Sequence, residues 1–179
     1  MFEPVKNFFR RRKIRKYSKA VSGEILPVAD ISTANIVIDV EEAEWDVLKE
    51  VILSWGRANG IKVNIYFFDF RKLGKDELLL TSIQTTIIKK ELDWLGTPEF
   101  SKIGALMYEP SDLFISMVDN GSFPIEFLSR CCKARFKIGR CGFEGHAYDM
   151  VMIGSPTEEL RSDSRQIFKA ITDFLTKIR

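Results

Sequence analysis

The chain of 179 residues has an ordinary globular composition, with 45% hydrophobic, 12% aromatic and 29% charged residues. That composition excludes an intrinsically disordered chain, and the length predicts one domain whose core needs no disulfide or metal. No apolar run reaches the roughly 18–20 residues of a membrane span, and the charged start is unlike a signal peptide. Three cysteines, an odd number, argue against a disulfide framework. We therefore expect a cytoplasmic protein.

The positive charge is concentrated at the N-terminus. Residues 1–20 contain eight lysines and arginines against one glutamate, a net charge of +7, so the rest of the chain carries −5. Val5, Phe8 and Phe9, continued by Ile14 and Tyr17, recur near helical spacing among these cations, which predicts a basic amphipathic helix over residues 1–21. A glycine and a proline mark residues 22–33 as a linker. The helix is therefore expected to be a semi-independent arm whose removal leaves the stability of the domain unchanged.

From residue 34 onward, short apolar runs alternate with amphipathic stretches. The runs have the β-branched and aromatic content of buried strands, and the stretches between them place apolar residues at i, i+3 and i+4. The predicted strands are 34–40, 61–68, 85–89, 112–118, 135–139 and 149–154. The predicted helices are 41–59, 97–107, 122–132 and 155–178. The last helix has the clearest start, because Ser155-Pro156-Thr157-Glu158 combines a serine cap, a first-turn proline and a capping-box glutamate.

Alternating strands and helices indicate βαβ units with right-handed crossovers. The expected fold is α/β, Rossmann-like and doubly wound: a mostly parallel sheet of five or six strands with helices on both faces. It occupies residues 34–179 as a single domain, preceded by the basic helix. Strand residues on both faces should be nearly fully buried, namely Ile36, Ile38, Ile65, Phe67, Phe114, Ile115, Ile138, Val151 and Ile153. The three tryptophans, Trp45, Trp55 and Trp94, are expected to be core or half-buried residues.

Ligands of open parallel sheets bind beyond the carboxyl ends of the strands, where the strand order reverses. This rule nominates the polar residues that follow each predicted strand. They are Asp39 with Glu41 and Glu42, Asp69 with Arg71, and above all Asp119, Asn120, Gly121 and Ser122 together with Gly139 and Arg140. The side chains of 119–122 can hydrogen-bond a ligand, and the N–H groups of the next helix can hold an anion. The alternative interpretation is that these residues only form turns and cap helices.

Specific catalytic and metal-binding motifs are missing. The glycines of residues 139–145 form neither a dinucleotide fingerprint nor a phosphate loop, and the single histidine, His146, has no nucleophile elbow to work with. Cys131, Cys132 and Cys141 are ligand types that suit zinc. Adjacent cysteines on one helix, however, point about 100° apart and lack the CxxC spacing of zinc knuckles. We therefore predict neither a metal nor a cofactor.

The basic N-terminal helix has three interpretations: attraction to anionic lipid, attraction to nucleic-acid phosphates, or docking on the domain with the charges in water. Phe8 and Phe9 among the cations favour lipid over nucleic acid, because apolar side chains can enter the headgroup boundary. A protein partner stays open as well. The residues expected to contact an anionic surface are Arg10, Arg11, Arg12, Lys13, Arg15 and Lys16.

Three segments resemble a family of small uncharacterised bacterial proteins. The segments are Ile88–Gly96 (IKKELDWLG), Ser111–Ser116 (SDLFIS) and Lys133–Gly139 (KARFKIG). The family shares the basic N-terminal helix, a Leu-Asn/Asp-Trp-x-Gly turn and an Ala-Lys/Arg-Phe-Lys-Ile/Val-Gly strand. This resemblance covers nearly the whole chain, and it implies a Rossmann-like fold with no known activity.

More distantly, residues 112–139 are similar to the acceptor-binding half of heptosyltransferase-type glycosyltransferases. There, an Asp-Leu-x-Ile strand, a glycine-containing turn, a helix and an Ala-x-x-x-Ile-Gly strand occur in the same order. The glycine-rich loop after the first strand and the sugar-nucleotide domain of those enzymes have no counterpart in this sequence. The resemblance therefore supports the fold. It does not assign a function, because function does not follow from fold alone.

Two functional hypotheses follow. The first is a non-catalytic binding or interaction module, cytoplasmic and peripheral to an anionic membrane surface. The alternative is a glycosyltransferase-like enzyme, or a relic of one, that binds a sugar or anionic ligand near residues 119–122 and 139–140. An open cleft with convergent carboxylates would favour the enzyme, whereas polar groups that only cap helices would favour the module.

Overall fold

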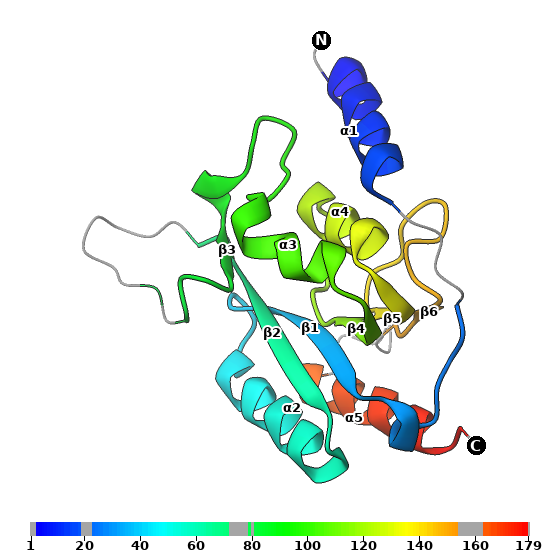
Figure 1. The fold of residues 1–179 in the computed structure, drawn as a ribbon. Coiled ribbons are helices and arrows are strands. Elements are labelled where there is room, and N and C mark those ends of the chain that lie inside the picture. The colour runs from blue at the N-terminus through cyan, green and yellow to red at the C-terminus, as the bar shows by residue number, and fades with distance from the viewer. Residues whose placement is uncertain (1–2, 19–22, 72–78, 80, 154–162, 179) are drawn as a thin grey trace.

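The protein is a Rossmann-like α/β fold, seen here in a computed structural model that describes residues 3–18, 23–71, 79, 81–153 and 163–178 (Figure 1). Within them, six strands form one sheet in the order β3-β2-β1-β4-β5-β6, and every neighbouring pair is parallel. The strands are β1 (Thr33–Asp39), β2 (Lys62–Asp69), β3 (Thr86–Ile88), β4 (Ser111–Ser116), β5 (Ala134–Gly139) and β6 (Met150–Val151). The strand order is that of a doubly wound fold, so the predicted fold class is confirmed.

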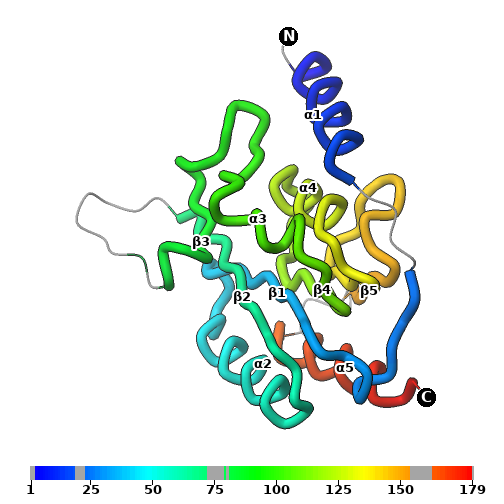
Figure 2. The backbone as a smooth tube through the Cα atoms, viewed as in Figure 1, coloured from blue at the N-terminus to red at the C-terminus, as the bar shows by residue number. Residues whose placement is uncertain are grey.

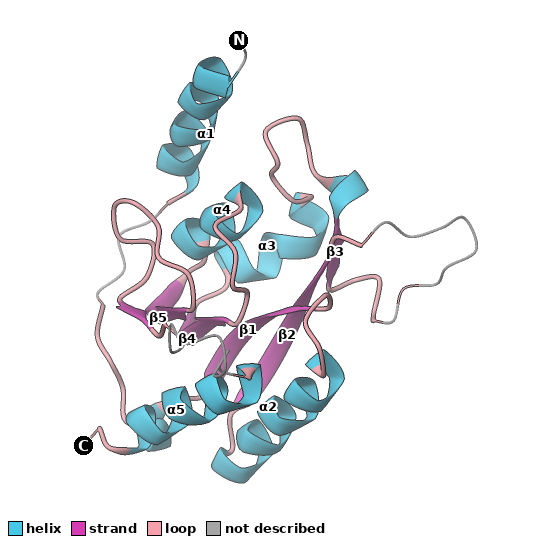
Figure 3. Cartoon of the chain, turned by 180° about the vertical axis from the view of Figure 1, so that it is seen from behind, coloured by secondary structure: helices cyan, strands magenta, loops and turns pink. Residues whose placement is uncertain are grey.

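Helices cover both faces of the sheet (Figures 1 and 3). They are α1 (Glu3–Tyr17), α2 (Trp45–Asn59), α3 (Phe100–Tyr108), α4 (Phe123–Cys131) and α5 (Ser164–Thr176), with short 3-10 turns η1 (Val28–Asp30) and η2 (Lys89–Glu91). Helices α2 and α5 lie on one face, and α3 and α4 lie on the other. The backbone trace shows α3 returning the chain from β3 at one edge to β4 beside β1 (Figure 2). None of the described helices is long and apolar enough to cross a membrane.

The core consists of two layers that share the sheet. Successive side chains of a strand point to opposite faces, so Val37 of β1 packs toward α3 and α4 while Ile36 and Ile38 pack toward α2 and α5. In the sheet register, Val37 lies opposite Tyr66 of β2 and Ser116 of β4. Because both faces are covered, the middle residues of β1 and β4 are apolar on both faces, and this explains why the sequence showed these strands as short apolar runs.

Three residues of the predicted core are not buried. Ile65 is half-buried, Val151 is 38% exposed and Ile153 is 81% exposed. The last two were placed in a strand over residues 149–154, but β6 contains only Met150–Val151 and lies at the edge of the sheet. An edge strand has a neighbour on one side only, so its apolar residues receive less cover than those of the central strands.

For two helices, the start found in the structure differs from the predicted one. Helix α2 begins at Trp45 rather than at residue 41, because Glu44 adopts the left-handed conformation (φ 58°) and the Asp39 carboxylate accepts a hydrogen bond from the Glu41 amide. The predicted capping box at residues 155–158 lies outside the described residues. Helix α5 begins at Ser164, and its N-cap carboxylate accepts a hydrogen bond from the first-turn amide of Arg165.

Helix α1 is docked on the α/β body over α4 and the turn before α3. Its half-buried residues recur at helical spacing and are Lys6, Arg10, Lys13, Ile14 and Tyr17. The Tyr17 ring lies 5.0 Å from that of Phe100 and 6.2 Å from that of the fully buried Phe127, measured between centroids. The helix is therefore packed against the domain, in contrast to the independent arm that the linker suggested.

Two cations of α1 anchor it to the turn at residues 93–97. The Arg10 Nε donates to the Leu95 carbonyl at 2.7 Å, and its guanidinium lies 4.4 Å from the centre of the Phe123 ring. Lys13 pairs with Asp93 at 2.6 Å. Although burial acts to raise the pKa of Asp93, hydrogen bonds from Lys13 and from backbone amides hold it below its ordinary value. The stability that this carboxylate contributes is lost as the pH falls through its lowered pKa.

The docking of α1 can be measured through Tyr17. Tyr17→Ala is expected to lower the free energy of unfolding by about 2 kcal/mol, roughly half the value for a fully buried aromatic residue, because the ring is half-buried. Phe8→Ala on the same helix is the matched control, since that ring is 62% exposed, and it should change stability by less than about 0.5 kcal/mol. Urea denaturation of both variants gives the comparison. Equal stabilities would show that α1 does not hold to the domain.

Candidate functional site

The place where the strand order reverses, between the carboxyl ends of β1 and β4, is occupied by the side chain of Arg140. This arginine follows β5, and only 9% of its side chain is exposed. Its guanidinium donates to Glu42 at 2.7 and 3.0 Å, to the Met117 carbonyl at 2.9 Å and to the Ser164 hydroxyl at 2.9 Å. Asp119 lies 3.5 Å away, and Ser164 also donates to Glu42. Apart from the Arg140 Nε, which is buried without a hydrogen-bond partner in the described part of the chain, these polar groups are therefore engaged with one another.

The carboxylates that follow β1 and β2 are also engaged locally. Asp39 accepts from the Glu41 amide at 2.9 Å, and burial raises the pKa of Asp39 above its ordinary value. Arg71 donates to Asp69 at 2.8 and 2.6 Å, and this pairing holds the pKa of Asp69 below its ordinary value. These contacts form two local turns rather than a set of carboxylates that converge on a cleft.

The loop between β4 and α4 has the character of a turn and helix cap. The Asn120 side chain accepts from the Ser122 amide at 3.1 Å, which is the geometry of an Asx turn. Ser122 is the N-cap of α4, but its side chain makes no capping hydrogen bond. Gly121 lines the pocket described below, whereas Asp119, Asn120 and Ser122 do not line it.

Gly139 is required for packing. A Cβ atom at this position would lie only 2.3 Å from the ring of Tyr148, far inside van der Waals contact. The Tyr148 hydroxyl is hydrogen-bonded to Ser129 at 2.6 Å, and burial raises the pKa of Tyr148 to about 12. The glycine thus makes room for a buried aromatic ring in the layer between the sheet and α4, rather than for a ligand.

The cysteines have raised thiol pKa values. Burial raises the pKa of Cys131 to about 12 and that of Cys132 to about 11, and the partly exposed Cys141 is shifted upward as well. Thiols with such pKa values carry little thiolate at neutral pH, and the thiolate is the nucleophile and metal ligand. Among the described residues, no group of three or more histidine, cysteine or carboxylate side chains is placed to hold a metal ion.

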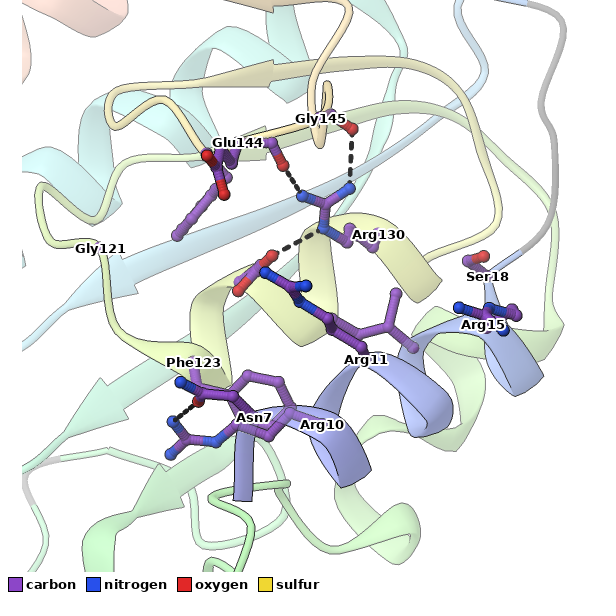
Figure 4. A pocket seen from close by; sticks show the side chains of 13 residues that line it. Asn7, Arg10, Arg11, Arg15, Ser18, Gly121, Phe123, Arg130, Glu144 and Gly145 are labelled. Atoms are coloured by element: carbon purple, nitrogen blue, oxygen red, sulfur yellow. Dashed lines mark hydrogen bonds and ion pairs between the residues drawn. The ribbon is translucent and has the colours of Figure 1, made fainter. Parts of the chain in front are cut away.

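A pocket of about 760 Å³ lies between α1, α4 and the loop that follows β5 (Figure 4). Helix α1 contributes Asn7, Arg10, Arg11, Ile14, Arg15 and Ser18. Helix α4 and the residue before its cap contribute Gly121, Phe123, Glu126 and Arg130, and the loop contributes Phe143, Glu144 and Gly145. The volume is within the range of small-molecule sites, roughly 300–1,000 Å³.

The pocket is strongly cationic. Four arginines and two glutamates line it, an excess of two positive charges. Arg130 is fixed in the wall, because it pairs with Glu126 at 2.9 Å and donates to the Gly145 carbonyl at 2.8 Å and to that of Glu144 (Figure 4). Arg11 and Arg15 make no hydrogen bond or ion pair with the described residues, and Arg11 reaches from α1 toward α4. Two cations of the lining thus keep their hydrogen-bonding capacity.

The predicted anionic-surface residues are divided among three environments. Arg10, Arg11 and Arg15 line the pocket, and Lys13 pairs with Asp93. The other two, Arg12 and Lys16, are exposed and lie outside the pocket lining. Nothing in the sequence near Arg130 or in residues 143–145 marked them as site residues. They meet α1 only through the tertiary fold.

The face of α1 that points away from the domain is apolar toward its N-terminal end. Val5 is 53% exposed and Phe8 is 62% exposed. The Phe9 ring packs edge-on against Trp94 at 5.7 Å, and Trp94 is itself 65% exposed. Trp94 was expected to be core or half-buried. It is exposed although Leu95 and Thr97 of the same turn are buried, and Gly96 of this turn lies against Phe123 of α4.

Comparison with known proteins yields one match. The model of a family described only as of unknown function matches residues 6–173, from within α1 to within α5. Helix α1 is therefore part of the unit that defines the family. No curated protein and no solved structure matches this chain.

Proposed function

Since this chain belongs to the family of unknown function DUF6913, we propose a role from its own surface: a non-catalytic binding module that associates with anionic membranes through the outward face of α1. The observation that carries the proposal is the exposure of Val5 and Phe8 on a helix that also contains five cations without a hydrogen-bond or ion-pair partner among the described residues. A water-exposed apolar cluster at one end of a basic helix is the arrangement by which interfacial helices enter the headgroup region.

The apolar part of this surface extends beyond α1. Phe9 and the exposed indole of Trp94 are in contact, and Trp94 belongs to the turn to which α1 is anchored. Aromatic side chains with a polar edge are suited to the membrane–water interface. Val5, Phe8, Phe9 and Trp94 together are called the aromatic tip below.

The basic part of the surface follows the aromatic tip along the same helix. Arg12 and Lys16 are exposed and make no ion pair with the described residues. Each cation near an anionic surface contributes about 1 kcal/mol, and this contribution is screened by salt. Nucleic acid is the less favoured anionic partner, because an aromatic tip adds nothing to phosphate contacts on a duplex.

The non-catalytic part of the proposal rests on the switch point. Arg140, Glu42 and Ser164 bind one another at the position where doubly wound enzymes bind their substrates. A glycosyltransferase-like activity at residues 119–122 and 139–140, suggested by the distant resemblance, requires this network to open. We therefore favour the binding module, acting at the cytoplasmic face of a membrane.

Vesicle co-sedimentation tests the proposed function. Full-length protein should bind vesicles containing phosphatidylglycerol and should not bind vesicles of phosphatidylcholine alone. Arg12→Gln/Lys16→Gln should weaken binding about tenfold or more, because two interfacial cations are lost. The matched control is Arg57→Gln/Lys62→Gln, two exposed cations on the opposite side of the fold, and it should leave binding unchanged.

The aromatic tip is tested in the same assay. Phe8→Ala should weaken binding several-fold and make the remaining binding more sensitive to salt, because the apolar contribution is removed. Tyr108→Ala, on the exposed side of α3, is the matched control. If all four variants bind as the wild type does, or if phosphatidylcholine vesicles bind equally well, the protein does not use α1 to recognise anionic membranes.

A further inference from the structure

The pocket between α1 and α4 is distinct from the outward face of α1. Its lining comes from three elements, and it contains the two arginines that have no partner among the described residues, Arg11 and Arg15. These lie four residues apart on α1, so their side chains emerge one turn apart on the same side of the helix. Arg12 and Lys16, between and beyond them, project elsewhere and do not line the pocket.

We propose that this pocket binds a phosphate monoester, held by the guanidinium groups of Arg11 and Arg15. The planar guanidinium presents paired N–H donors that match phosphate oxygens bidentately. The phosphate monoester belongs either to a lipid headgroup or to a small soluble molecule. The inference rests on the proposed membrane function only for the first of these sources.

The charge of the lining selects a dianion. Glu126 and Glu144 offset two of the four arginines, which leaves the excess of two positive charges. A phosphate monoester carries nearly two negative charges at neutral pH, whereas a phosphate diester carries one. The two carboxylates therefore set a preference for the monoester, because a singly charged ligand leaves one positive charge of the lining without a counter-charge.

The other residues of the pocket lining are held in place by their own contacts, which supports a preformed binding site. Arg130 ties the loop at residues 144–145 to α4 through both carbonyls and through Glu126. On the other side, the Arg10 guanidinium is held by the Leu95 carbonyl and by the Phe123 ring. These contacts fix two of the four cations in the wall. Arg11 and Arg15 are then free to orient toward a ligand.

Calorimetric titration tests the soluble source. The full-length protein is titrated with glycerol 3-phosphate and with inorganic phosphate at fixed ionic strength. Arg11→Gln/Arg15→Gln should weaken binding at least tenfold. Arg12→Gln/Lys16→Gln changes the charge of the same helix by the same amount but leaves the pocket intact, so it should weaken binding less than twofold.

Vesicles test the lipid source. Phosphatidic acid presents a phosphate monoester and phosphatidylglycerol a diester, and the two kinds of vesicle are prepared with matched surface charge. The wild type and Arg12→Gln/Lys16→Gln should bind phosphatidic acid at least fivefold more tightly than phosphatidylglycerol, and Arg11→Gln/Arg15→Gln should lose this preference. The preference is a ratio, so it is separable from the overall loss of membrane binding that tests the proposed function.

A soluble monoester that binds, or a preference for phosphatidic acid, supports the proposal if the Arg11/Arg15 variant alone removes it. Two results overturn it. One is that neither glycerol 3-phosphate nor inorganic phosphate binds in solution and the two kinds of vesicle bind equally. The other is that the two double variants weaken the binding of a soluble probe by the same factor, which assigns the effect to the net charge of α1. Unfolding transitions of both variants, measured alongside, confirm that each is folded.

Discussion

Phe114→Ala is expected to lower the free energy of unfolding by about 3–5 kcal/mol, the largest effect of any single substitution considered. Phe114 is fully buried on β4, a central strand between β1 and β5. Its ring belongs to the layer that α3 and α4 cover. Truncation removes an aromatic ring and leaves a cavity that the rigid sheet cannot close, so the transfer and cavity costs add.

Urea denaturation measures this effect, with Phe8→Ala as the control for the same chemical change at an exposed position. The slope of the transition should stay unchanged, which would show that the native state alone is affected. A loss of less than about 1 kcal/mol would mean that the layer between the sheet and α4 is loosely packed. That result would contradict the buried position of Phe114.

The second large effect is expected at Arg140. Arg140→Met keeps the length of the side chain but removes its charge. It leaves the Met117 carbonyl and the Ser164 hydroxyl without the donor they share, and Glu42 without its ion-pair partner. Breaking a buried ion pair from one side costs about 3–5 kcal/mol. Because Glu42 keeps some exposure to water, we expect a loss of about 3 kcal/mol in the free energy of unfolding.

The double variant Arg140→Met/Glu42→Gln separates the contribution of the Arg140–Glu42 ion pair from that of the other contacts of the Arg140 side chain. Removing the stranded carboxylate should recover at least about 1 kcal/mol relative to the single Arg140 variant, as a double-mutant cycle measures. Calorimetric or urea-induced unfolding provides the values. If the two changes prove additive, the Arg140–Glu42 pair does not stabilise the closed switch point. The proposal of a non-catalytic module would then lose its main support.

The fold was predictable because its signal is local. Each central strand is buried on both faces, so runs such as residues 34–40 are mostly apolar, with Asn35 and Asp39 as their polar members, and stand out from the helices. The edge strands of the sheet were harder to predict from the sequence. Hydrophobicity does not tell whether a strand has one neighbour or two, so Val151 and Ile153 looked like core residues although β6 ends at the border of the sheet.

The candidate site was predicted only in pieces. Asp119 and Arg140 were both nominated from the rule for parallel sheets, but their pairing depends on the tertiary fold. The pocket could not be predicted from the sequence, because Arg11 and Glu144 are far apart in the sequence and neither belongs to a motif. Sequence spacing reports which residues share a face of one element, and it does not report which faces of two elements meet.

Helix α1 shows how an amphipathic pattern can mislead. Phe8 and Phe9 suggested the face that would enter an apolar surface, and the cations, Arg10 and Lys13 among them, were expected to contact an anionic surface. The docked face instead contains Arg10, Lys13 and Tyr17, whose long side chains place an apolar stem on the domain and a polar end at its border. The Arg10 guanidinium packs over the Phe123 ring, where an ordinary amphipathic helix would place an apolar side chain such as leucine.

The docking of α1 on α4 also sets an order of events during synthesis. The ribosome makes Arg10 more than a hundred residues before Phe123, the ring on which its guanidinium rests. At roughly 5–20 residues per second, the nascent helix waits on the order of 5–25 s for its docking surface to emerge. Throughout that interval every cation and aromatic residue of the helix is uncovered. The surface that we propose for membrane binding is therefore exposed before the domain that later covers part of the helix is complete.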